Sequence, residues 1–118
     1  MINKSEPIEI EELLERVSGN KEFVIKMLDL FFTNSENRLA NLRNEFNNRN
    51  YVELAEEAHK LKGIVGNLSI NNAMGILKDL HTMAALQNDF QIDSLLADLE
   101  TTISEAKIFY RNNPELNV

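Results

Sequence analysis

The chain has 118 residues, of which 43% are hydrophobic and 26% charged, a composition typical of one ordinary soluble domain whose core needs no disulfide or metal. It contains no cysteine, which excludes a disulfide framework, a zinc ribbon and a thiol nucleophile, and its net charge of -7 argues against nucleic acid as a partner. No apolar run approaches the ~20 residues of a membrane span and the first residues form no signal-peptide core, so we expect an untargeted, cytoplasmic chain.

The chain is predicted to be all-helical, because glycine and proline are scarce and no β-branched alternation marks a strand. A short opening helix is expected to begin with Pro7 in its first turn, after Ser5, and to end at the break over residues 18–20. Its apolar residues recur at helical spacing: Ile8, Ile10, Leu13, Leu14 and Val17.

A long second helix should follow, with Asn20 as its N-cap. Its inward positions step by three and four residues: Val24, Leu28, Phe31, Leu39, Leu42 and Phe46. A second apolar stripe, Phe23, Met27 and Leu30, lies on the other side of its first turns. We interpret that stripe as the surface that the opening helix covers.

Residues 47–50 have the composition of a turn that separates the second helix from a third. The third helix has the inward seam of a helix in a bundle: Tyr51, Leu54, Ala58, Leu61, Val65 and Leu68. A fourth is predicted from about Ile70 to Leu86, capped by Ser69, and a fifth that Pro114 terminates. Their inward residues are Ala73, Leu77, Leu80 and Ala84, and then Ile92, Leu95, Leu99, Ile103, Ala106 and Tyr110.

Connections this short predict antiparallel neighbours, and so an up-down four-helix bundle with a short N-terminal covering helix. The whole chain, residues 1–118, is interpreted as a single domain with its core at about 8–111. No apolar seam remains for a dimer, so a monomer is expected.

The third helix carries the residues that point to a function. At roughly 100° per residue, His59 lies about 130° from the inward seam, so its imidazole should face water. Ala55, Gly63 and Gly66 share its face, and Lys62 lies on the flank. Two glycines inside a helix cost about 1 kcal/mol each relative to alanine, which suggests that a partner approaches the imidazole closely.

Three kinds of chemistry could use this histidine. Acyl transfer lacks a serine or cysteine nucleophile. The Glu56-x-x-His59 spacing is half of a di-iron site, but the only other histidine, His81, has Lys78 at the matching position. Phosphoryl transfer remains, because neutral imidazole is a good nucleophile near pH 7 and Lys62 could stabilise the phosphoryl charge.

The run from Ala58 to Ser69, AHKLKGIVGNLS, resembles the A-H-x-L-K-G signature of histidine-containing phosphotransfer (HPt) domains. The resemblance covers roughly residues 8 to 111 and extends to the start of the second helix. It implies that His59 is the phosphoacceptor, that Lys62 holds the phosphoryl group and that Gly63 gives a partner access. Many members have glycine where Ser69 stands and glutamate where His81 stands, and we interpret His81 as a packing or surface variation.

The resemblance implies a phosphoprotein of two-component signal transduction whose partner is a response-regulator receiver domain, with a hybrid sensor histidine kinase as a further candidate. The receiver would bring the Mg²⁺, and this chain would bind no cofactor or metal of its own. It has no ATP-binding motif, so it would be a phosphocarrier and not an enzyme. Lys60 is a candidate for docking and Phe32 for an apolar contact, although core packing also explains Phe32.

Two alternatives stay open on the sequence alone. A helical scaffold module could bind a receiver or another protein without phosphotransfer, although His59, Lys62 and Gly63 argue against it. A metal-carboxylate bundle enzyme is more distant. The sequence does not distinguish a free-standing protein from the cytoplasmic part of a membrane-bound sensor kinase.

Overall fold

The computed structural model describes residues 6–116 and contains, over that range, five α-helices and no strand. The bounds of the helices are α1 Ile10–Arg16, α2 Lys21–Asn47, α3 Tyr51–Asn67, α4 Asn71–Ala85 and α5 Asp89–Arg111. The prediction of an all-helical chain is therefore confirmed.

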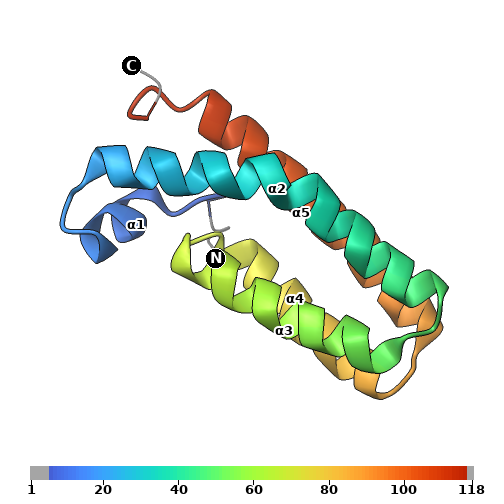
Figure 1. Cartoon of the computed structure of the whole chain (residues 1–118). Helices are drawn as coiled ribbons and strands as arrows, with labels where there is room; N and C mark the ends of the chain where they lie inside the picture. Colours follow the sequence, from blue (N-terminus) through green and yellow to red (C-terminus); the bar gives the residue numbers. More distant parts are fainter. Residues whose placement is uncertain (1–5, 117–118) are drawn as a thin grey trace, which may run out of the picture.

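The four long helices are arranged as two pairs. Figure 1 shows α3 beside α4, with α2 and α5 lying together along the other side. The most extensive contact is between α3 and α4, and α4 also contacts α5 while α2 contacts both α3 and α5. Each long helix thus packs against two others, and the short helix α1 contacts α2.

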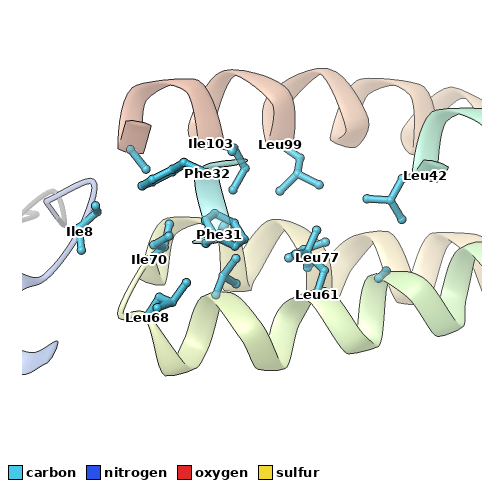
Figure 2. Packing of buried hydrophobic residues seen from close by; sticks show 14 of the residues in the cluster. Ile8, Phe31, Phe32, Leu42, Leu61, Leu68, Ile70, Leu77, Leu99 and Ile103 are labelled. Carbon is cyan, nitrogen blue, oxygen red and sulfur yellow. The ribbon is translucent and has the colours of Figure 1, made fainter. Parts of the chain in front are cut away.

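The core lies between the two helix pairs. Figure 2 shows Phe31 and Leu42 of α2 and Leu99 and Ile103 of α5 facing Leu61 and Leu77. The predicted inward residues of α3 and α4 are buried except Tyr51, which only borders the core: Leu54, Ala58, Leu61, Val65 and Leu68, then Ala73, Leu77, Leu80 and Ala84. Helix α5 differs by one position, because Leu96 is fully buried where Leu95 was predicted and Leu95 only borders the core.

The opening helix is shorter than predicted and begins at Ile10, so Pro7 lies outside it, while Ser5 is outside the described residues. The backbone before the helix bonds to another part of the chain: the Glu9 N–H donates a hydrogen bond to the Ser69 carbonyl at 3.0 Å. Ile8 is nevertheless fully buried, and Figure 2 shows it at the end of the core that holds Leu68 and Ile70. This extended segment closes one end of the core.

The prediction that α1 covers the second stripe of α2 is wrong. Phe23 is 47% exposed and Leu30 66%, and only Met27 is partly buried. Seven helical residues span only about 10 Å, and α1, which contacts α2 and is hydrogen-bonded to the α3–α4 turn, leaves Phe23 and Leu30 uncovered. The stripe therefore remains on the surface.

Of two predicted N-caps, the one of α2 is confirmed and the one of α4 is wrong. Asn20 caps α2 as expected, because its side chain accepts a hydrogen bond from the Phe23 N–H at 3.1 Å. Ser69 does not cap α4, whose N-cap is Ile70. Ser69 instead has a φ of +57°, in the left-handed region that favours glycine, and its side chain bonds to α1. Glycine would adopt this conformation without strain.

No helix within residues 6–116 is both long and apolar enough to cross a membrane.

Candidate functional site

His59 projects from the middle of α3 into solvent, as the helical spacing predicts. Its position is fixed by the seam on the opposite face, where its neighbours Ala58 and Leu61 are buried in the core. The imidazole is thus held on a rigid helix and is accessible to another molecule.

A shallow pocket of about 360 Å³ lies beside this imidazole. His59, Lys62, Gly63 and Gly66 of α3 line it, so the structure brings four of the predicted residues together. The remaining lining residues are Arg16, Asn67 and Met74. Lys62 is half-buried, and no ion pair to it is recorded within the described part of the chain, so its ammonium is available to an anion.

The two glycines of the site differ in their surroundings. A Cβ added to Gly63 would meet no atom within 4 Å, so the space over this residue is open. A Cβ added to Gly66 would lie 3.3 Å from Sδ and Cε of Met74, a side chain of α4. Gly66 is partly buried, and close packing of α3 on α4 is a sufficient reason for that glycine. Ala55, one turn before His59, is also partly buried against the core.

Two residues considered for docking have clear structural partners. Lys60 is exposed and its Nζ lies 3.5 Å from Oε1 of Glu57, one turn earlier. Phe32 is buried, with its ring stacked on Tyr110 at 5.6 Å between centroids and in a T-shaped contact with Phe31. Phe32 is therefore a core residue and cannot serve as an apolar docking contact.

His81 lies beside His59, a proximity that the sequence analysis did not address. It projects from α4 into solvent, and its ring centroid is 5.9 Å from that of His59, with the two planes inclined at 47°. A surface position agrees with the interpretation of His81 as a packing or surface variation, and the structure adds that it lies beside His59. Only the pairing of α3 with α4 brings these histidines, 22 positions apart, into contact.

Arg16 is the site residue that the sequence analysis missed. It belongs to the last turn of α1, and its side chain lines the same pocket as His59 of α3. Its Nη2 donates to Oε1 of Glu12 at 3.2 Å, and that carboxylate also accepts hydrogen bonds from Ser69 and Asn71 at 3.0 and 3.4 Å. The Ser69 hydrogen bond is the main cause that lowers the pKa of Glu12, with smaller contributions from Arg16 and Asn71, and burial acts against it.

An apolar groove adjoins the pocket. It is lined mainly by the exposed stripe of α2 and by the end of α3: Met27, Leu30, Phe31, Asn34, Arg38, Ile64, Asn67 and Leu68. Asn67 borders both hollows, so the groove and the His59 pocket are neighbours on one surface.

Metal-ligating side chains do not gather anywhere in residues 6–116 as a group of three or more histidines, aspartates or glutamates. Glu56 and His59, whose spacing suggested half of a di-iron site, therefore have no third ligand of this kind beside them within that range.

Comparison with protein-family models decides which family the signature belongs to. The model of the Hpt domain matches residues 26–107, which is more than half of the chain. The chain belongs to the Hpt domain family. Comparison with the curated proteins and with the solved structures gave no significant match. The matched residues of this Hpt domain include His59, Lys62 and Gly63 on α3 and His81 on α4, whereas Arg16 precedes them.

Proposed function

We propose that this Hpt domain is a phosphorelay intermediate that accepts a phosphoryl group on His59 and passes it on. The donor is the aspartyl phosphate of a response-regulator receiver domain, and the acceptor is another receiver or the same one in the reverse direction. The observation that carries the proposal is an exposed imidazole beside an available ammonium and an open glycine, at His59, Lys62 and Gly63 of an Hpt family member.

The transfer is a substitution at phosphorus. A ring nitrogen of neutral His59 attacks with its lone pair, the N–P bond forms, and the P–O bond to the aspartate breaks with its electron pair left on the carboxylate. The proton on the other ring nitrogen of His59 then passes to solvent. Lys62 stabilises the charge on the phosphoryl oxygens, as expected where the protein acts by positioning and electrostatics.

Gly63 leaves the space that an in-line approach requires. The receiver domain brings the acyl phosphate and the Mg²⁺, and this chain holds neither. The apolar groove beside the pocket supports docking of such a domain, because Leu30 and Met27 present apolar surface that otherwise faces water. Lys60 adds a positive charge toward the acidic phosphate-binding pocket of the receiver.

The rest of the proposal concerns the form in which the chain works. We infer an antiparallel up-down bundle of the four long helices that acts as one monomeric domain, with a core at about residues 8–111. We place it in the cytoplasm, where it acts as a carrier without kinase activity of its own.

Labelling by a phosphorylated receiver tests the proposal directly. The purified chain is mixed with phosphorylated receiver domains and Mg²⁺ and examined for an acid-labile, base-stable phosphate. We expect a label on the natural chain and none on His59→Gln, whose helical circular dichroism should be unchanged because His59 is exposed. A label that persists in His59→Gln would move the acceptor elsewhere.

The competing function is a scaffold module that binds a receiver without phosphotransfer. The apolar groove would serve this role equally well, so binding alone does not separate the two. If receivers bind the chain but none labels it, the scaffold function replaces the carrier function.

A further inference from the structure

We propose that Arg16 is a second cationic ligand of the phosphoryl group at His59, an inference that rests on the proposed function. Arg16, His59 and Lys62 line the same pocket, although α1 and α3 are separate elements. A phosphoryl group carries a charge of about −2 near pH 7 and three strong acceptor oxygens, which match the planar donors of a guanidinium.

Glu12 holds the guanidinium beside the pocket. Ser69 and Asn71, at the α3–α4 turn, bond to the Glu12 carboxylate, and that carboxylate accepts the Arg16 Nη2–H. The backbone bond from the Glu9 N–H to the Ser69 carbonyl fixes the same junction. The start of α1 is thereby tied to the turn that follows α3, and Arg16 lies only one helical turn beyond Glu12, so it is kept near the site.

The guanidinium retains donors for an anion. A guanidinium has five N–H donors, and the one hydrogen bond recorded for Arg16 in residues 6–116 uses one of them. The Arg16–Glu12 pair is weak because the two side chains are 47% and 42% exposed. A dianion in the pocket can therefore attract Arg16 without breaking a strong ion pair, while the bonds from Ser69 and Asn71 continue to satisfy Glu12.

Arg16 and Lys62 then hold the phosphoryl oxygens from two directions. Lys62 approaches from the helix that carries His59, and Arg16 approaches from α1 across the pocket, where the space over Gly63 is open. The cation on α1 lies outside the segment that matches the Hpt family model, so it would be a feature of this chain's own N-terminal region.

A small phosphoryl donor tests Arg16 without any receiver. Phosphoramidate transfers its phosphoryl group to imidazole: the His59 lone pair attacks phosphorus, the P–N bond breaks, and ammonia leaves with the electron pair and takes up the ring proton. The rate of uptake is measured by intact mass and by ³¹P NMR at two salt concentrations. The variants are Arg16→Gln, Arg16→Lys and the matched control Arg111→Gln, an exposed arginine in the last turn of α5.

We expect uptake about three- to tenfold slower in Arg16→Gln, the effect of losing one partly screened charge-assisted hydrogen bond. Arg16→Lys should recover part of the rate because it keeps the charge, and Arg111→Gln should match the natural chain. The difference between the natural chain and Arg16→Gln should shrink at high salt, which a purely structural role of Arg16 would not produce.

Equal rates in the natural chain and Arg16→Gln would overturn the assignment of Arg16 while leaving the carrier function intact. An equal loss in Arg16→Gln and Arg111→Gln would also overturn it, because the effect would then follow net charge alone. If the natural chain gains no phosphate, or gains it in His59→Gln as well, the proposed function fails and the role of Arg16 fails with it.

Discussion

Substitutions at Gly63 should separate the stability of the fold from access to His59. Gly63 lies in the interior of α3, and a Cβ there would meet no atom within 4 Å. Gly63→Ala should therefore raise the free energy of unfolding by about 0.5–1 kcal/mol, the helix-propensity difference between the two residues. For a domain of this size, that gain corresponds to a Tm increase of about 2–6 °C.

The larger variant Gly63→Leu should have the opposite effect on activity. Its side chain would fill the space that a receiver needs for in-line approach, and displacing a reacting group by about 1 Å can cost on the order of 100-fold in rate. We expect phosphotransfer from a receiver to slow by about 10- to 100-fold while the Tm stays at or above that of the natural chain. Thermal unfolding and a phosphotransfer time course measure the two effects.

Gly75 provides the matched control. It is an exposed glycine inside α4, a Cβ there also meets no atom within 4 Å, and it does not line the His59 pocket. Gly75→Leu should raise the Tm and leave transfer unchanged. Transfer at the natural rate in Gly63→Leu would refute the access argument, and equal slowing in Gly75→Leu would show that the effect is not local.

Three further predictions follow from burial, titration and the second histidine. Leu77→Ala, at a fully buried position, should lower the free energy of unfolding by about 2–5 kcal/mol in a denaturant titration, whereas Leu86→Ala, on the surface, should change it by less than about 0.5 kcal/mol. Burial and a hydrogen bond to Asp29 raise the pKa of Tyr110 from 10 to about 12, so the neutral phenol stabilises the fold below pH 10 and this contribution is lost as the pH rises through 12. Chemical denaturation should accordingly show that Tyr110→Phe loses less stability than the natural chain as the pH rises from 10 to 12, and an equal loss in both would contradict this role of Tyr110. His81→Gln should still accept one phosphoryl group from a phosphorylated receiver, because no lysine–glycine pair follows this histidine. Intact mass measures this uptake, and its complete loss would make His81 an acceptor or an essential partner of His59.

Much of the fold was predictable because the spacing of apolar residues over a few helical turns identifies both a helix and its buried face. The spacing of apolar residues in α3 and α4 identified the buried positions, and the Asn20 cap fixed the start of α2. The same periodicity placed His59 on the exposed face. An error arose where two adjacent leucines were candidates for one buried position: Leu95 and Leu96 differ by about 100° around the helix, and Leu96 is buried in the core while Leu95 borders it.

The conformation of Ser69 was beyond sequence reasoning. Serine is a common N-cap, and the sequence offers no sign that this residue adopts a positive φ and turns its hydroxyl toward Glu12. The exposed stripe of α2 was also misassigned, because two apolar faces on one helix do not say which element covers either of them.

The sequence by itself determined the helices, most of their buried seams and the exposure of His59 beside a lysine and a glycine, since all of these depend on residues within two helical turns. Only the tertiary structure decided what surrounds that histidine. His81 is 22 positions later and Arg16 is 43 positions earlier, and both reach the site through the packing of α4 and the anchoring of α1. Those contacts depend on which helices pack together and on hydrogen bonds between residues far apart in the sequence, and the spacing of residues within one helix predicts neither.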